Sequence, residues 1–188
     1  LRKALSMAID RELITKVAMY NYTEPAHQTA LSGSFSRFRI SDESIKEKWV
    51  IYNPTLANQK IDMLGYKRNK SGHYLDHNGE EIFITIGIVS GWADWIRAGQ
   101  IISKNLNDIG IKSRVKTQDF GAWFNDLQMG EFTAAIGWAE SGATPYPMYE
   151  GLMASKNVKP KGEVSGTNWH RFGLSEVDDL VARFEKTS

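Results

Sequence analysis

The sequence predicts an α/β fold in which a mostly parallel sheet is flanked by helices. Three observations support this prediction: an apolar run at residues 82–89, a long helical periodicity after it, and further strand-like runs at residues 111–117 and 132–138. The elements alternate strand, helix, strand, helix, strand with short connections. Such alternation is typical of parallel strands joined by right-handed crossovers.

The first predicted strand, residues 82–89, is rich in Ile, Phe, Thr and Val and is apolar at both alternating sets of positions. This pattern indicates a strand buried on both faces. Ser90 is placed to cap the helix that follows. Apolar residues on one face of that helix recur at spacings of three and four: Trp95, Ala98, Ile102, Leu106 and Ile109. Gly110 is expected to end the helix in a left-handed conformation, with Ile111 packing back on Leu106.

The second predicted strand spans residues 111–117. Its solvent-facing side carries a basic row: Lys112, Arg114 and Lys116. Asp119 is placed to cap the next helix, and Gly130 ends it. The apolar stripe of that helix comprises Phe120, Trp123, Phe124 and Leu127. The third strand is expected at residues 132–138, with small residues in its middle.

Flanking segments are expected to be mainly helical. Residues 1–20 are predicted as one or two helices, the second capped by Asp10. A helix is expected to open at Asn53-Pro54, because proline suits the first helical position. Residues 76–79 indicate a turn before the first strand, and Ser175 is placed to cap a last helix.

The carboxyl ends of parallel strands share one edge of a sheet, and α/β folds bind ligands there. Trp92 and Trp95 follow the first strand, Asp119-Phe120 follows the second, and the polar segment 138–145 follows the third. Aromatic residues and a polar loop therefore converge on one rim. We interpret this rim as a ligand-binding site.

Five of the six tryptophans divide between core and rim, and Trp49 gives no indication of either. Trp123 lies on a helical stripe, which favours the core. Trp95 is balanced between core and ligand contact, because it lies on the apolar stripe but in the first helical turn. Ligand contact is favoured for the tryptophans at strand or loop ends: Trp92, Trp138 and Trp169. An indole offers a flat apolar face and one N–H donor, a combination that suits sugar rings.

Composition excludes several classes of function. The 188 residues contain no cysteine, which removes disulfides, thiolate zinc sites and cysteine nucleophiles. Lys and Arg number 23 and Asp and Glu 22, a balance that gives no indication of nucleic acid or an anionic membrane as partner. Phosphate-loop, dinucleotide and G-x-S-x-G motifs are absent, so no cofactor is expected. His73 and His77 lie among turn residues, which does not favour a metal site.

The chain starts without Met inside a predicted helix, and it contains neither a signal peptide nor an apolar run long enough to span a bilayer. We interpret residues 1–188 as a piece of a longer protein.

Several segments match one family in their order along the chain. They are residues 1–11, 52–54 with 64–66, 101–111, 130–138 and, more weakly, 168–169 with 177–180. As an ordered set they resemble the extracytoplasmic substrate-binding proteins of ABC importers in the oligopeptide, dipeptide and nickel group, solute-binding protein family 5. The resemblance implies a periplasmic-binding-protein-like lobe of type II. Residues 1–188 would then be a single α/β lobe, most of the carboxy-terminal lobe of a two-lobed protein.

The same resemblance implies partners, location and activity. The partners would be a small-molecule ligand, the membrane permease subunits and the missing amino-terminal lobe of the same chain. The protein would work outside the cytoplasm, in the periplasm or attached to the cell surface. It would be a binding protein and not an enzyme.

In this family the loop after the Gly-Trp strand lines the cleft, and peptide-binding members usually carry aspartates there. This chain has Ser141 and Thr144 instead, with Glu140 as the acidic residue of the loop. Together with residues 90–95, the loop is more similar to members that bind cello-oligosaccharides or related sugars. The expected stacking residues are Trp92, Trp138, Trp169 and, less clearly assigned, Trp95. The expected hydrogen-bonding residues are Asp94, Glu140, Ser141, Thr144 and Tyr146.

Three alternatives stay open on the sequence. Within the same class, the ligand is an oligopeptide whose ammonium group is held by Glu140. As an enzyme, such as a glycosidase, the chain needs two convergent carboxylates, and Asp94 with Glu140 is the rim pair available. The third alternative is a structural or signalling receptor lobe, since a fold does not determine a function.

Overall fold

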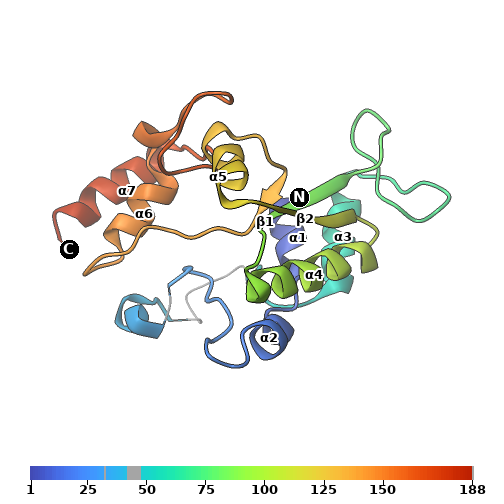
Figure 1. Ribbon diagram of the computed structural model, residues 1–188, viewed down its shortest axis with the longest axis horizontal. Coiled ribbons are helices and arrows are strands. Elements are labelled where there is room, and N and C mark those ends of the chain that lie inside the picture. The colour runs from blue at the N-terminus through green and yellow to red at the C-terminus, as the bar shows by residue number, and fades with distance from the viewer. Residues whose placement is uncertain (32, 42–47, 188) are drawn as a thin grey trace.

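A three-stranded parallel sheet with strand order β2-β1-β3 forms the centre of the chain. The structure is a computed structural model that describes residues 1–31, 33–41 and 48–187. The strands and their crossover helices are β1 (Phe83–Val89), α4 (Ala93–Asp108), β2 (Lys112–Gln118), α5 (Phe120–Met129) and β3 (Ala134–Ala135) (Figure 1). The α/β prediction is confirmed, including the parallel direction of the strands.

β1 is the middle strand, and its register determines where the loops emerge. It pairs with β2 over its whole length, from Phe83 opposite Lys112 to Val89 opposite Gln118. The carboxyl half of β1 is buried, as the apolar run predicts. Because β1 and β2 end level with each other, the segments that follow them emerge at the same edge of the sheet.

β3 is shorter than the strand predicted at residues 132–138. Thr133 replaces a backbone partner: its Oγ1 accepts from the Thr85 N–H and donates to the Thr85 carbonyl, both at 2.9 Å. Regular pairing covers only Ala134 and Ala135. Gly137-Trp138 therefore lies beyond the ladder, and Trp138 is not constrained to alternate across a sheet.

At three of the four ends of α4 and α5, the predicted residue caps or ends the helix. Asp119 accepts a hydrogen bond from the Ala122 N–H at 3.0 Å, and Gly130 ends α5 in the left-handed region, as predicted. Gly110 ends α4 likewise, and the Ile111 N–H donates to the Leu106 carbonyl at 2.9 Å. The predicted Ser90 cap is wrong. Gly91 adopts a positive φ, and the N-cap of α4 falls at the next residue, which makes no side-chain cap.

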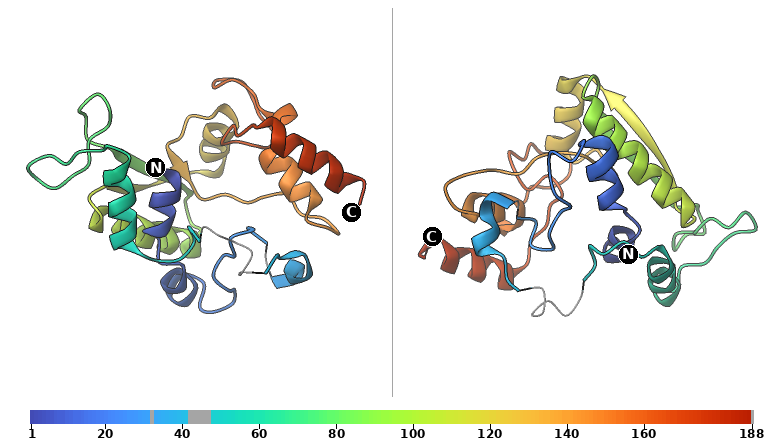
Figure 2. Two further views of the ribbon diagram at one scale, coloured as in Figure 1. Left: turned by 180° about the vertical axis from the view of Figure 1, so that it is seen from behind. Right: turned by 90° about the horizontal axis from the view of Figure 1, so that it is seen from below.

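The remaining helical elements pack around this unit. They are α1 (Arg2–Met7), α2 (Arg11–Leu13), the π-helix η1 (Ile14–Ala18), the 3-10 helix η2 (Gly33–Phe38), α3 (Pro54–Met63), α6 (Tyr146–Met153), the 3-10 helix η4 (Ser155–Asn157) and α7 (Ser175–Glu185). Asp10 caps α2, as predicted. α3 opens at Asn53-Pro54, also as predicted, and the Asn53 side chain caps it. The predicted Ser175 cap is wrong, since Ser175 is already the first residue of α7. α6 and α7 lie at one end of the molecule, and the hairpin of residues 66–82 projects at the other (Figures 1 and 2).

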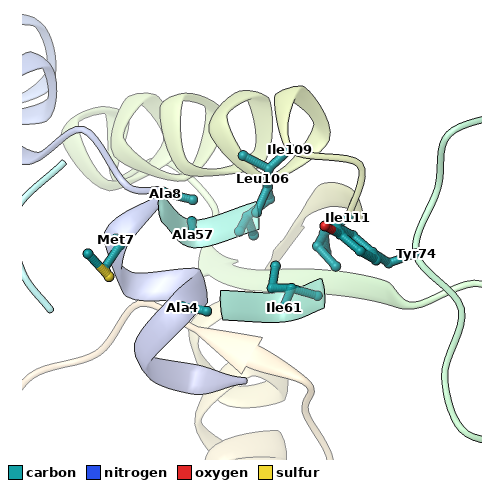
Figure 3. Close-up of a cluster of buried hydrophobic side chains, with 9 residues drawn as sticks. All are labelled: Ala4, Met7, Ala8, Ala57, Ile61, Tyr74, Leu106, Ile109 and Ile111. Carbon is teal, nitrogen blue, oxygen red and sulfur yellow. The ribbon is translucent and has the colours of Figure 1, made fainter. Parts of the chain in front are cut away.

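The main hydrophobic core lies between α1, α3, α4 and the start of β2 (Figure 3). Its fully buried large side chains include Ile61, Tyr74 and Ile111. The Tyr74 hydroxyl donates to Asp62 Oδ1 at 2.8 Å, and burial together with this bond raises the pKa of Tyr74. This core anchors α4 and so holds one face of the sheet. None of the helices in the described ranges is long and apolar enough to span a bilayer.

Two glycines at helix ends test the packing of this core. Gly65 and Gly110 have φ of +84° and +88°, but an added Cβ has open space at Gly65 and would lie 2.6 Å from the Gly72 carbonyl oxygen at Gly110. Gly65→Ala is therefore expected to lower the free energy of unfolding by about 1–2 kcal/mol, the cost of left-handed backbone. Gly110→Ala should cost about 1–3 kcal/mol more. Chemical denaturation of the two variants measures the difference, and equal losses would contradict the close approach.

Candidate functional site

Three exposed aromatic side chains gather at the carboxyl edge of the sheet. Trp92 follows β1 and the Gly91 turn, Phe120 is the first residue of α5, and Trp138 follows β3. Their exposed fractions are 37%, 47% and 41%, respectively. We call these three residues the rim surface. The convergence that strand order predicts is therefore present.

Trp123 supports the rim surface from below. It is only 1% exposed, and its ring centroid lies 6.3 Å from that of Trp92, 5.8 Å from that of Phe120 and 5.2 Å from that of Trp138. Each exposed ring thus rests on a buried aromatic ring. This confirms the prediction that Trp123 belongs to the core.

The exposed rings are held at defined angles. The Phe120 and Trp138 planes differ by 1° with centroids 6.4 Å apart, and Trp92 is tilted by 40° to Phe120 at 6.3 Å. Rigid rings with matched orientations lose little side-chain entropy when a ligand packs on them. The rim surface is therefore suited to flat apolar ligand faces.

Trp95 and Trp169 are half-buried and flank the exposed rings. Trp95 meets Trp92 edge-on at 4.6 Å, and Trp169 meets Trp138 edge-on at 5.5 Å. Nε1 of Trp169 is buried and has no acceptor among the described residues. The structure thus brings the four predicted stacking residues into one aromatic cluster. Within it, Trp95 packs against Trp92 and Trp169 packs against Trp138.

Phe120 was predicted both as part of an apolar helical stripe and, because it follows the second strand, as part of the rim, but it was not among the expected ligand-binding residues. The structure exposes it, because the first turn of α5 extends past the edge of the sheet while Trp123, one turn later, lies over β1. The available signal was its position immediately after the predicted cap at Asp119. Residues in a first turn after a strand face the rim.

Two of the predicted polar residues lie close to the rim tryptophans in sequence and space. Asp94 is exposed in the first turn of α4, where an anion is favoured by the helix dipole, and its Oδ1 accepts from the Trp95 N–H at 2.8 Å. Glu140 is exposed, and its side chain lies against α6, where a Cβ on Gly151 would come within 3.1 Å of Glu140 Cγ. Both carboxylates are therefore accessible, but Glu140 has a packing role as well.

The other predicted polar residues follow the loop away from the sheet. Ser141 is exposed, and Thr144 Oγ1 accepts from the Tyr146 N–H at 3.4 Å. The Tyr146 ring packs edge-on against Phe184 of α7 at 6.2 Å. Burial and the nearby Glu185 carboxylate raise the pKa of Tyr146. The structure therefore places Tyr146 at the contact between α6 and α7.

The rim surface is an open face and not an enclosed pocket. The depression beside it, between Trp138, Glu140, Gly151 and Trp169, holds about 30 Å³. Pockets for small molecules typically measure about 300–1,000 Å³. Within the described ranges, no group of three or more acidic or histidine side chains is arranged to hold a metal ion. The arrangement can therefore stack on one side of a ligand and donate or accept hydrogen bonds at its edge.

The fold agrees with the comparison to known families. Residues 1–160 match the family described as bacterial extracellular solute-binding proteins, family 5 Middle. The chain belongs to this family. The resemblance noted in the sequence is thus confirmed at the level of family.

Individual relatives are longer than this chain. The oligopeptide-binding protein OppA of Mycobacterium tuberculosis is 26% identical over an alignment of 188 positions that covers 97% of this chain and 29% of the relative. A crystal structure of a periplasmic oligopeptide-binding protein of an ABC transporter from Thermotoga maritima superimposes with a TM-score of 0.88 at 26% identity, covering 98% of this chain and 35% of that one. The chain therefore spans about a third of the length of these proteins or less.

Several solved structures of similar proteins contain ligands. A second Thermotoga maritima structure has mannohexaose bound and matches with a TM-score of 0.82 at 26% identity, covering 96% of this chain and 34% of that one. The oligopeptide-binding protein AppA of Bacillus subtilis, in complex with a nonapeptide, matches with a TM-score of 0.77 at 22% identity, covering 100% and 35%. At that identity the second comparison shows only that the fold is shared.

Stability measurements separate the supporting ring from an exposed one. Trp123→Ala removes a fully buried ring and is expected to lower the free energy of unfolding by about 3–5 kcal/mol. Trp138→Ala removes a partly exposed ring and should cost about 1–2 kcal/mol. Urea denaturation of the two variants provides the comparison. Equal losses would mean that Trp138 belongs to the core.

Proposed function

We propose that residues 1–188 are part of the substrate-binding component of an ABC importer that captures an oligosaccharide outside the cytoplasm. The chain would be one α/β lobe of a two-lobed protein and would deliver its ligand to membrane permease subunits without chemical change. The observation that carries the proposal is the rim surface. It presents three exposed aromatic rings at the edge of the sheet where such folds bind ligands.

The chemistry of the rim favours a neutral sugar. Sugar rings have apolar faces that pack on aromatic rings and hydroxyl edges that need donors and acceptors. The parallel Phe120 and Trp138 rings offer such faces, and Asp94 and Glu140 offer acceptors nearby. The mannohexaose complex of a protein 26% identical to this chain supports the same ligand class.

The open geometry of the rim favours a second lobe. A bound small molecule usually has about 70–90% of its surface buried. The rim surface covers one side of a ligand, so another part of the protein must cover the opposite side. The chain spans 29% of one relative's length, which leaves ample sequence for an amino-terminal lobe.

An oligopeptide is the second candidate ligand. The curated relative in Mycobacterium tuberculosis is named as an oligopeptide-binding protein. A peptide ammonium group buried in a closed cleft needs a carboxylate partner, because an unpaired buried charge is very unfavourable. Glu140 is the acidic residue of the loop after Trp138 and would hold that group.

Binding measurements on the full-length protein test the role of the rim surface. Trp138→Ala and Phe120→Ala are each expected to weaken oligosaccharide binding by about 1–3 kcal/mol, because each removes apolar area that the ligand covers. The matched control is Phe83→Ala. Phe83 is similarly exposed, at 45%, but lies at the amino end of β1, so binding should be unchanged.

Isothermal titration calorimetry with a manno- or cello-oligosaccharide gives the three dissociation constants. Unchanged binding in both rim variants would refute the stacking assignment. A weakening by Phe83→Ala equal to theirs would show that the losses are not specific to the rim.

Glu140→Gln distinguishes the two ligand classes. With a neutral sugar, the amide still accepts and also donates, so the loss should stay within about 1–2 kcal/mol, the excess of a charged over a neutral hydrogen bond. With a peptide, the variant leaves a buried cation unpaired and should cost about 3–5 kcal/mol. Salt should weaken binding only in the peptide case. Loss of peptide binding in Glu140→Gln, with no oligosaccharide raising the melting temperature, would establish the peptide alternative.

A further inference from the structure

A hollow of about 360 Å³ lies where the turn of residues 168–171 meets the end of α5 and the first residue of α1. Its size falls within the range of about 300–1,000 Å³ that is typical of small-molecule pockets. None of its lining residues in the described ranges is acidic, whereas four are basic: Arg2, Lys161, His170 and Arg171. We call this hollow the basic cavity. It includes none of the three residues of the rim surface, so it is a separate candidate site.

The guanidinium group of Arg171 is held in place by backbone groups. Its Nη1 donates to the Trp169 carbonyl at 2.6 Å, and its Nη2 donates to the Gln128 and Glu163 carbonyls at 3.0 and 3.1 Å. It lies against Gly130, where an added Cβ would be 2.5 Å from Arg171 Cζ. Carbonyl groups satisfy the N–H donors of a guanidinium, but they carry no net charge to balance it. Within the described ranges, no carboxylate pairs with the charge of Arg171.

The other cations of the basic cavity add to this excess of positive charge. Lys161 lies 3.1 Å from Glu131 in an exposed ion pair. Arg2 has no carboxylate partner in the part of the chain that the structure describes. Burial and the charge of Arg2 lower the pKa of His170, which indicates that Arg2 lies near it. Two unpaired guanidinium groups, those of Arg2 and Arg171, therefore border one cavity. Walls of one charge sign concentrate counter-ions of the opposite sign.

Two N–H donors at the basic cavity have no acceptor among the described residues. They are Nε1 of Trp169 and Nε of Arg171, and both atoms are buried. Both residues line the cavity. Buried donors without an acceptor are rare in folded proteins, and a bound ion explains both of these. The oxygens of phosphate and sulfate accept from several N–H groups at once, and such charge-assisted bonds are strong. The unpaired donors therefore indicate an oxyanion.

The turn that carries these donors is fixed in a strained conformation. Asn168 and Arg171 have φ of +48° and +55°, in the left-handed region that residues other than glycine seldom adopt. Asn168 holds the turn, because its Nδ2 donates to the Phe172 carbonyl at 2.7 Å and its Oδ1 accepts from the Phe172 N–H at 2.9 Å. Strained backbone of this kind recurs at ligand clamps, where the surrounding structure imposes it. The turn therefore presents Trp169 and Arg171 in a preorganised arrangement.

We propose that the basic cavity binds a small inorganic oxyanion, phosphate or sulfate. The anion balances the charges of Arg2 and Arg171 and accepts hydrogen bonds from Trp169 Nε1 and Arg171 Nε. A neutral ligand would leave both guanidinium groups unpaired, and a cation would be repelled. This site goes beyond the capture of a sugar, because it takes a ligand of different charge and needs none of the three residues of the rim surface.

Isothermal titration calorimetry of the full-length protein with sodium phosphate and sodium sulfate tests the proposal. We expect saturable binding of one anion per chain. Arg2→Gln should weaken it at least about tenfold, because the variant removes one of the two unpaired charges. The matched control is Lys3→Gln. Lys3 is the next residue of α1 and is exposed like Arg2, but it does not line the cavity. Its replacement should change the dissociation constant less than about twofold, because solvent screens an exposed charge.

A second measurement reports on the turn itself. In protein with isotope-labelled tryptophan, the indole N–H resonance that Trp169→Phe removes should shift when phosphate is added. The same phosphate concentration should leave that resonance unshifted in Arg2→Gln. Arg171→Lys keeps the positive charge but loses the Nε–H donor, so it should weaken phosphate binding about tenfold or more. If Arg171→Lys does not fold, Trp169→Phe takes its place and should weaken binding in the same direction.

Three results would overturn the proposal. The first is the absence of saturable binding at millimolar phosphate and sulfate. The second is equal weakening by Arg2→Gln and Lys3→Gln, which would reveal attraction to net charge alone. The third is phosphate that displaces a bound oligosaccharide and is insensitive to Arg2→Gln, because that anion would lie at the rim surface. Failure of every oligosaccharide to bind would refute the proposed ligand of the rim surface but would leave the anion measurements unaffected.

Discussion

The packing of the Trp123 indole is the interaction on which the rest of this part of the molecule depends. The ring is buried between β1 and five other aromatic rings, which belong to Trp92, Trp95, Phe120, Phe124 and Trp138. These rings arrive from the ends of all three strands. One buried side chain therefore contacts residues that follow each of the three strands. Its packing determines the positions and orientations of the exposed rings. Close packing transmits any change at such a position to its neighbours.

The aromatic cluster also contains two buried N–H donors that have no acceptor among the described residues. They are Nε1 of Trp123 and Nε1 of Trp169. Trp123 lies beneath the rim surface at 1% exposure, and Trp169 meets Trp138 edge-on at 5.5 Å. An unpaired buried donor is costly in a stable protein, and the cluster carries this cost at the rim as well as beneath it.

Local chemistry made part of the fold predictable. The ends of α4 and α5 follow from Gly110, Asp119 and Gly130, since a left-handed glycine or a capping carboxylate acts within a few residues. Ser90 and Ser175 carry the same kind of signal, yet neither caps a helix. In each case the helix starts one or two residues away from the predicted position. The length of β3 also depended on a distant residue. Thr133 forms hydrogen bonds with the backbone of Thr85, 48 positions earlier, and regular strand pairing starts only after it.

The sequence by itself determined the alternation of strands and helices, the parallel sheet, the rim at which the aromatic residues converge, and the resemblance to solute-binding proteins. These depend on periodicity and order along the chain, which are visible without coordinates. Only the tertiary structure decided that Phe120, which the sequence places both on a helical stripe and at the rim, is exposed. Phe120 and Trp123 lie on one helical stripe, three residues apart, but one is at the edge of the sheet and the other over its middle strand. Burial depends on what an element packs against, and a pattern along one helix does not contain that information.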